Sequence, residues 1–219
     1  FEAVTKQQPG NAQASYRLGS AQASLYMSQK KPDKAIQVIN QQIKQFPNQP
    51  EPYERLGQIY FAQKNYAKAE ELYRKALTID KDNLAAYGLL GRLFMAQNSQ
   101  DKAIQEFTNA LRVNPKYIQA HIILAQIYES KNDREKTKYH YREALKINPK
   151  SPVAANNLAW ILAESGSDLD EALKLAQTAA GELRDVASIQ DTLGWVYYKK
   201  GSYRAAIDAL RDAGSKDPK

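Results

Sequence analysis

The chain has 219 residues, of which 43% are hydrophobic and 25% charged, and its formal net charge is +7. No apolar run reaches the roughly 18 residues that suggest a membrane span, and no stretch of the given sequence has the pattern of a signal peptide. The chain contains no cysteine, which excludes disulfides and thiolate metal sites.

A leucine followed by a small residue recurs along the chain. Successive leucines, here called the anchors, are 38, 34, 34, 34 and 35 residues apart. The anchors are Leu18, Leu56, Leu90, Leu124, Leu158 and Leu193, and the small residues after them are Gly19, Gly57, Gly91, Ala125, Ala159 and Gly194. A second small residue begins the other half of each unit, so the pattern predicts two helices that cross closely where facing side chains are small. Units of this length bury their apolar faces only by stacking.

The predicted elements follow in chain order. Residues 1–11 are expected to be the tail of an earlier second helix, with Phe1 and Val4 on one face. Six repeats follow, over about 12–49, 50–83, 84–117, 118–151, 152–186 and 187–219. The first carries four extra residues, close to one helical turn, and is expected to have a longer first helix. The fifth has one extra residue, with Ser167 or Asp168 as the expected helix cap. The two ends suggest a piece of a longer array.

These units resemble the tetratricopeptide repeat (TPR) family over nearly the whole chain. The stretches "LGQIYFAQKNYAKAEELYRKAL" (56–77) and "LGRLFMAQNSQDKAIQEFTNAL" (90–111) carry the resemblance most clearly. It implies an all-α, right-handed α-solenoid, a superhelix of about six helix-turn-helix repeats. It also implies a concave groove, lined by the first helices, in which peptide partners lie.

Helical geometry identifies a second face on each first helix. Residues two before, two after and five after an anchor point about 130° away from the core cluster. On this face the early repeats are mostly polar, whereas the last two place Trp160 and Trp195 in adjacent repeats. An alternative for the two tryptophans is structural packing against the next repeat.

An aromatic pair beside amides and a carboxylate is typical of a peptide-binding hot spot. We therefore expect a protein–protein interaction scaffold that binds a protein or peptide segment in the groove. The candidate contact residues are Trp160, Trp195, Tyr198, Asn156, Asn157, Asp191, Phe61, Met95, Arg92 and Ile122.

Nothing in the sequence converges on a reaction centre. No zinc-protease motif, phosphate loop or nucleophile elbow is found, so we expect no enzyme, no cofactor and no metal. His121 falls where Tyr53 and Tyr87 fall in their repeats and is expected to be a packed ring. The segment 131–150 holds seven Lys/Arg against three Asp/Glu, but no aromatic stacking platform accompanies it, which disfavours nucleic acid as a partner.

Other roles stay open at this stage. Terminal repeats that stack on other copies would make the chain a self-assembly module, and a regulatory TPR arm of a larger enzyme is a third class. The last two repeats are similar to the ends of bacterial TPR proteins, some of them lipoproteins of cell-envelope or exopolysaccharide systems. That similarity favours a bacterial origin and leans toward the cell envelope, while the compartment stays open.

Overall fold

The protein is described by a computed structural model that covers residues 12–216; the predicted tail of an earlier helix at 1–11 lies outside the described residues. Every regular element in the described part is an α-helix, and consecutive helices form pairs. The helices are α2 (Ala12–Ser28), α3 (Pro32–Gln45), α4 (Pro50–Ala62), α5 (Tyr66–Ile79), α6 (Leu84–Ala96), α7 (Gln100–Val113), α8 (Ile118–Ser130), α9 (Arg134–Ile147), α10 (Pro152–Ser165), α11 (Leu169–Glu182), α12 (Ala187–Lys199) and α13 (Tyr203–Lys216). The prediction of an all-α architecture of six helix pairs is confirmed.

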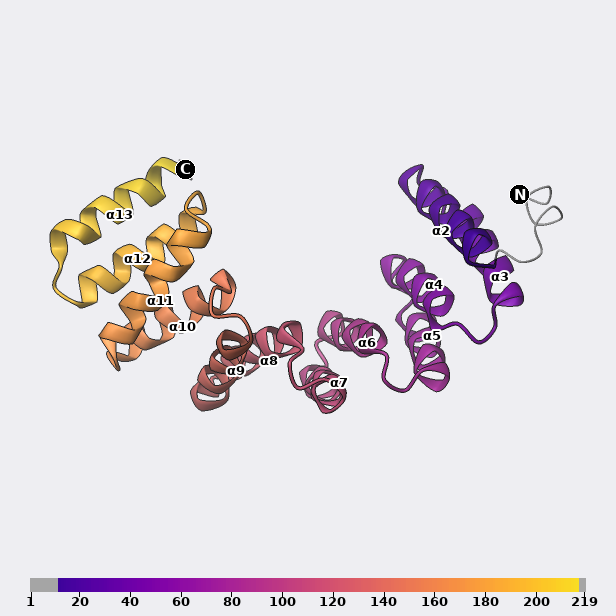
Figure 1. The fold of residues 1–219 in the computed structure, drawn as a ribbon, viewed down its shortest axis with the longest axis horizontal. Helices are drawn as coiled ribbons and strands as arrows, with labels where there is room; N and C mark the ends of the chain where they lie inside the picture. The colour runs from indigo at the N-terminus through magenta and orange to yellow at the C-terminus, as the bar shows by residue number, and fades with distance from the viewer. Residues whose placement is uncertain (1–11, 217–219) are drawn as a thin grey trace. The chain divides into compact units, whose positions relative to one another are not determined.

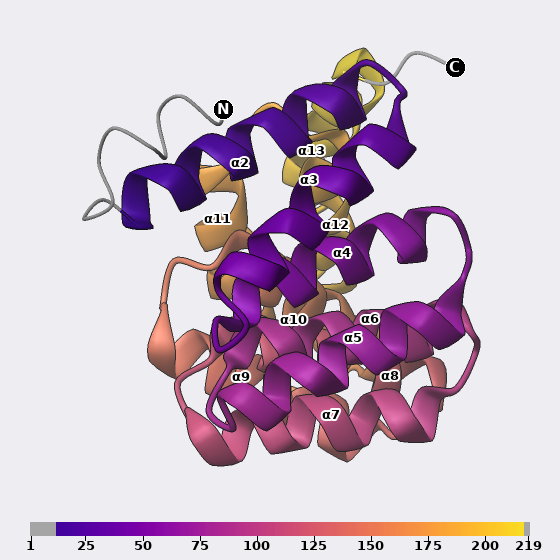
Figure 2. The ribbon, with the colours of Figure 1, turned by 90° about the vertical axis from the view of Figure 1, so that its right-hand side faces the viewer.

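The chain divides into two compact units, each built from three helix pairs. The N-terminal unit comprises residues 1–113 and the C-terminal unit comprises residues 114–219. Within each unit the two helices of a pair lie side by side and the pairs contact one another in chain order (Figures 1 and 2).

Short turns with a left-handed residue join the two helices of each pair. The residues with positive φ in these turns are Lys30, Lys64, Asn98, Asn132, Gly166 and Gly201. They recur with the period of the repeat, and only the last step is longer, by one residue. The extra residue of the fifth repeat lies just after Gly166, where the Asp168 side chain accepts a hydrogen bond from the backbone N–H of Glu171 (2.9 Å) and caps α11. Asp168 is thus the cap that the sequence left open between two residues.

The small residues after the anchors make room for large side chains rather than for other small ones. A Cβ atom at Gly57 would lie 2.4 Å from the ring of Tyr73, and one at Gly91 would lie 2.5 Å from the ring of Phe107. Both rings are buried. The close crossing of α4 with α5 and of α6 with α7 therefore depends on an aromatic ring seated against a glycine, which corrects the expected contact between small residues.

A lysine lies over the aromatic ring eight residues before it in each of the first four repeats. The pairs are Lys34 with Tyr26, Lys68 with Tyr60, Lys102 with Phe94 and Lys136 with Tyr128, at 4.8–5.9 Å from nitrogen to ring centroid. These cation–π contacts join the second helix of each pair to the first. They keep the same period from the first repeat onward.

The first repeat therefore has a different register from the one predicted. The predicted core anchor Leu18 is 43% exposed, and Ser20 and Ala23, expected on the open face, are buried. Ala23 lies one regular repeat before Gly57 and is its equivalent, and it shares a buried cluster with Ile39 as Gly57 contacts Tyr73.

The physical reason is the length of α2. It has 17 residues against 13 in α4, so the predicted longer first helix is confirmed, but the extra turn lies at its start. A shift of four residues is close to one turn and keeps the same helix face, so the Leu18–Gly19 pair imitates the anchor pattern one turn early.

A recurring side-chain hydrogen bond ties the first helices to the loop that precedes them. The residue three before the anchor donates to the carbonyl oxygen six residues earlier. The pairs are Tyr53 to Pro47, Tyr87 to Lys81, His121 to Pro115 and Gln190 to Arg184, at 3.1–3.2 Å. His121 is buried and plays the part that the tyrosines play, as the sequence predicted.

Candidate functional site

The two tryptophans and a tyrosine form a stacked aromatic ladder in the C-terminal unit. The ring centroids of Trp160 on α10 and Trp195 on α12 are 6.0 Å apart with planes at 28°. Trp195 stacks on Tyr198, one helical turn further along α12, at 5.3 Å and 18°. Tyr203 on α13 continues the ladder at 5.8 Å from Tyr198. We use "aromatic ladder" for these four residues.

The ladder is anchored at Trp195 and open at its other rungs. Trp195 is partly buried and packs against the core cluster around Leu158 and Leu162. Trp160 is 38% exposed and Tyr198 is 50% exposed. The two interpretations of the tryptophans from sequence are therefore not exclusive, because Trp160 contacts the next first helix and still presents ring surface.

Polar and charged groups fix the orientation of Trp195. Its indole Nε1–H donates to Glu164 Oε1 at 2.7 Å. The Lys199 Nζ lies 4.9 Å from the Trp195 ring centroid and 3.7 Å from the same Glu164 oxygen. One carboxylate thus satisfies the indole donor and balances the cation on the ring face.

The amides predicted beside the tryptophans are mainly engaged inside the unit. Asn157 Nδ2 donates to the Tyr141 hydroxyl (2.9 Å), and Asn157 Oδ1 accepts from Asn156 Nδ2 (3.2 Å). The Tyr141 hydroxyl in turn donates to Glu129 (3.4 Å). Burial, and then the charge of Glu129, raise the pKa of Tyr141 to about 12, so the hydroxyl keeps its proton. Asn157 is therefore part of a buried network.

The remaining predicted residues of this unit differ in exposure. Asp191 on α12 is exposed. Ile122 on α8 is partly buried and packs against the core cluster that also holds Leu158.

An open cleft lies beside Trp160. Its walls include Glu129 from α8, Arg134 from α9, and Trp160, Ile161 and Glu164 from α10. The cleft measures about 620 Å³ including the solvent at its mouth. It brings one aromatic ring and two carboxylates to the same solvent-filled space.

The other predicted site residues belong to the N-terminal unit and are described there. Phe61 contacts the ring of Tyr66 at 5.7 Å, and with Arg92 it lines an open cleft next to Tyr73. Met95 is exposed on α6. These residues form a second candidate surface, separate from the aromatic ladder.

Sequence reasoning missed three members of the site. Glu164 follows Trp160 by four residues, a same-face spacing that was a usable signal. Tyr203 and Tyr141 come from second helices, to which the geometry of the groove face does not apply.

Two histidines meet behind α8. His121 Nδ1 and His140 Nδ1 are 3.0 Å apart, and His121 Nε2 donates to the Pro115 carbonyl. Since neutral His121 then carries its proton on Nε2, His140 must donate from Nδ1. Burial, and then the charge of His121, lower the pKa of His140 to about 4. The pair is a neutral structural contact at pH 7.

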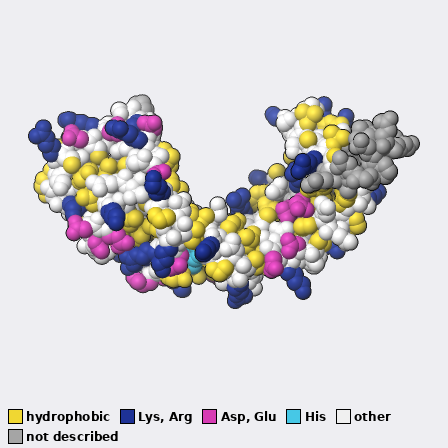
Figure 3. All heavy atoms as spheres, viewed as in Figure 1, with side chains coloured by type: hydrophobic (Ala, Val, Ile, Leu, Met, Phe, Trp, Pro, Cys, Tyr) yellow, Lys and Arg dark blue, Asp and Glu magenta, His cyan; other side chains and the backbone are white. Residues whose placement is uncertain are grey.

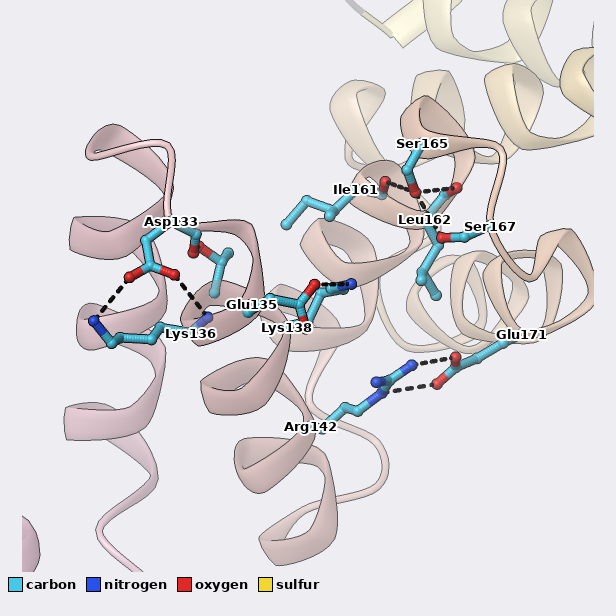
Figure 4. A network of polar contacts seen from close by, with 11 residues as sticks. Asp133, Glu135, Lys136, Lys138, Arg142, Ile161, Leu162, Ser165, Ser167 and Glu171 are labelled. Atoms are coloured by element: carbon cyan, nitrogen blue, oxygen red, sulfur yellow. Dashed lines mark hydrogen bonds and ion pairs between the residues drawn. The ribbon is translucent and has the colours of Figure 1, made fainter.

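The basic segment 131–150 is largely neutralised by its own surroundings. Five of its cations bind carboxylates: Lys136 with Asp133, Lys138 with Glu135, Arg142 with Glu171, Lys146 with Glu143 and Lys150 with Glu182. Figure 4 shows three of these pairs, including the two-bond contact of Arg142 with Glu171 between α9 and α11. On the face drawn in Figure 3, Lys and Arg side chains alternate with Asp and Glu side chains on each unit. This pattern gives nucleic acid no concentrated basic stripe.

No helix among residues 12–216 is both long and apolar enough to span a membrane. The same residues contain no group of three or more His, Asp or Glu side chains arranged to hold a metal ion.

The arrangement of helix pairs defines a class, the α-helical repeat proteins in which each pair contacts its neighbours. Sequence comparison assigns the family. Tetratricopeptide repeat models match residues 1–50, 20–83, 60–127, 118–151 and 140–174. The chain belongs to the tetratricopeptide repeat family, as its repeats predicted. A comparison with curated proteins finds no match.

Solved structures with the same fold include three TPR-type proteins. PilW, a type IV pilus biogenesis factor, has a TM-score of 0.70 at 20% identity, covering 94% of each chain. A tetratricopeptide repeat protein from Parabacteroides merdae has a TM-score of 0.69 at 16% identity, covering 94% of this chain and 81% of its own. YrrB, described as a TPR protein with an unusual peptide-binding site, has a TM-score of 0.65 at 20% identity, covering 82% of this chain and 92% of its own. At these identities the likeness is one of fold.

Proposed function

We propose that this protein is an interaction scaffold whose C-terminal unit binds an extended segment of another protein across the aromatic ladder. The fold and its structural neighbours support a protein-interaction scaffold in general. The observation that carries the finer proposal is the stacked pair Trp160–Trp195 with exposed ring surface on Trp160 and Tyr198. Exposed tryptophan and tyrosine in a rigid setting are the residues that dominate binding energy at protein interfaces.

The ladder suits this role because it is ordered before a partner arrives. The Glu164 hydrogen bond and the core contacts of Trp195 hold the ring in place. A partner then meets a fixed aromatic surface and loses little free energy to ordering it. Asp191, exposed on the same helix, offers acceptors for the backbone N–H groups of an extended segment. The scaffold acts by binding, without chemistry of its own.

The surface of the N-terminal unit around Phe61, Arg92 and Met95 is a second proposed contact. Its cleft combines one aromatic ring with a guanidinium group, which suits a partner segment carrying an acceptor group. YrrB shares this fold and is described as having a peptide-binding site, which supports peptide recognition as the general mode.

The test is a comparison of partner affinity between matched variants of the whole chain. Trp160→Ala and Trp195→Ala should each weaken binding of an isolated partner by roughly thirtyfold or more, the loss expected of hot-spot residues. Tyr139→Ala removes an equally exposed aromatic from α9, away from the ladder, and should leave affinity unchanged. Circular dichroism of each variant verifies the fold. Equal affinity of the tryptophan variants and the wild type would reject the proposal.

Self-assembly is a second candidate, favoured by Leu210 on α13. It is 39% exposed, with Ile207 and Tyr203 exposed beside it. The equivalent residues of the other second helices are all fully buried: Ile39, Tyr73, Phe107, Tyr141 and Ala176. An apolar face in this position suits a helix pair of a second copy. Light scattering that shows concentration-dependent mass, abolished by Leu210→Asp, would support this candidate, whereas a monomer at every concentration would exclude it.

A further inference from the structure

The cleft beside Trp160 has a chemical character that separates it from an ordinary apolar pocket. It joins an exposed indole ring to the carboxylates of Glu129 and Glu164. The electron-rich face of an indole and a nearby carboxylate both attract cations. The cleft is therefore built from two groups with the same preference.

The adjoining rung of the ladder already holds a cation in this way. Lys199 lies over the Trp195 ring, with Glu164 close enough to pair with its charge. This contact uses a side chain of the protein itself. Trp160 has no cation over its ring within the described residues, although the same Glu164 also lines its cleft.

The charge of the first helices in this unit points the same way. Among them, α8, α10 and α12 carry the acidic residues Glu129, Glu164 and Asp191 and only one lysine, Lys199, which is engaged with Glu164. The chain as a whole has a net charge of +7. The ladder thus lies on an acidic surface of a basic protein, which draws a basic segment toward it.

We infer that the partner segment of the proposed function presents a basic side chain, arginine or lysine, to this cleft, where it stacks on Trp160 and pairs with Glu129 and Glu164. The inference rests on the proposed function and adds the chemistry of the partner. Arginine fits better than lysine, because its planar guanidinium stacks on aromatic rings and binds carboxylates through two donors.

Other side chains fit the cleft less well. An acidic side chain would be repelled by the two carboxylates. An apolar side chain would displace water from them without supplying a partner, at a cost in free energy. Arg134, which also lines the cleft, is a competing cation, and its removal should favour a basic ligand.

The experiment uses the two indole N–H signals that a chain with two tryptophans gives in a ¹⁵N-correlated NMR spectrum. N-acetyl-arginine amide is titrated into the full chain, and the Trp160 signal is assigned from its loss in Trp160→Phe. The arginine derivative should shift this signal. N-acetyl-citrulline amide, which has the same shape but no charge, should not shift it at the same concentration.

Single substitutions then test each wall. Glu129→Gln should weaken the arginine effect by roughly two- to fivefold, as expected for one partly exposed ion pair. Arg134→Gln should strengthen it. Glu135→Gln is the matched control, since Glu135 binds Lys138 on α9 and does not line the cleft. Equal shifts with arginine and citrulline derivatives, or no response to Glu129→Gln, would overturn the inference.

This experiment fails separately from the proposed function. If partner affinity depends on Trp160 while the arginine derivative does not bind, the scaffold role stands and the basic ligand is rejected. If the arginine derivative binds while partner affinity ignores Trp160, the cleft recognises cations and the proposed function is rejected.

Discussion

Replacing Gly91 by alanine should destabilise the N-terminal unit, although alanine is the better helix former. The added Cβ would lie 2.5 Å from two atoms of the Phe107 ring, where ordinary contacts are 3.4–4 Å. Phe107 is buried, so its ring can move away only by displacing the core. Overpacking of this kind costs about 1–3 kcal/mol, and alanine regains about 0.5–1 kcal/mol in a helix. The expected net loss in the free energy of unfolding is about 1–2 kcal/mol.

Urea denaturation followed by circular dichroism and by tryptophan fluorescence measures this effect. Both tryptophans lie in the C-terminal unit, so fluorescence reports that unit while circular dichroism reports the whole chain. Gly181→Ala is the control, because a Cβ there meets nothing within 4 Å, and it should be neutral or stabilising by up to about 1 kcal/mol. Adding Phe107→Leu to Gly91→Ala should recover part of the loss. A Gly91→Ala variant as stable as the wild type would refute the ring-on-glycine packing.

Two further predictions concern the turn residues and the histidine pair. Lys64 has a left-handed backbone (φ 59°), so Lys64→Gly should raise the free energy of unfolding by about 0.5–1 kcal/mol in urea denaturation. Asn98→Gly should gain less, because asparagine tolerates this conformation, and an equal gain at both sites would contradict the explanation. Since the pKa of His140 is lowered to about 4 in the folded state, from about 6.5 when unfolded, the unfolded chain binds more protons between these values and stability should fall as pH drops through that window. Allowing for partial exposure, the loss is about 1–2 kcal/mol between pH 7 and pH 4, and His140→Gln should flatten the pH dependence measured by thermal unfolding.

The repeat architecture was predictable because the constraints that produce it are local in sequence. The glycine at Gly57 or Gly91 is required by a ring sixteen residues later, and the turn returns once in every repeat, so one period carries the whole fold. The first repeat was read one turn out of register because α2 gains a full turn at its start. A pattern that repeats every 3.6 residues cannot distinguish Leu18 from a true anchor by face alone.

The site was predictable in position and less so in its contacts. Helical angles placed Trp160 and Trp195 on one face, since that depends only on backbone geometry. Which partner each polar group chooses depends on side-chain rotamers across helices. Asn157 therefore turned out to be bonded to Tyr141, sixteen residues earlier, and the Trp195 indole to Glu164.

The two tryptophans have different physical roles, although they occupy equivalent positions. Trp195 has its N–H bonded to Glu164 and a lysine over its ring, and its remaining surface packs on the core. It therefore acts as a platform that holds the ladder in one geometry. Trp160 rests on that platform and keeps ring surface at the open cleft. Loss of Trp195 should consequently disturb Trp160 as well, whereas loss of Trp160 leaves Trp195 anchored. Binding energy at this surface depends first on the order that Trp195 imposes and then on the contact that Trp160 makes.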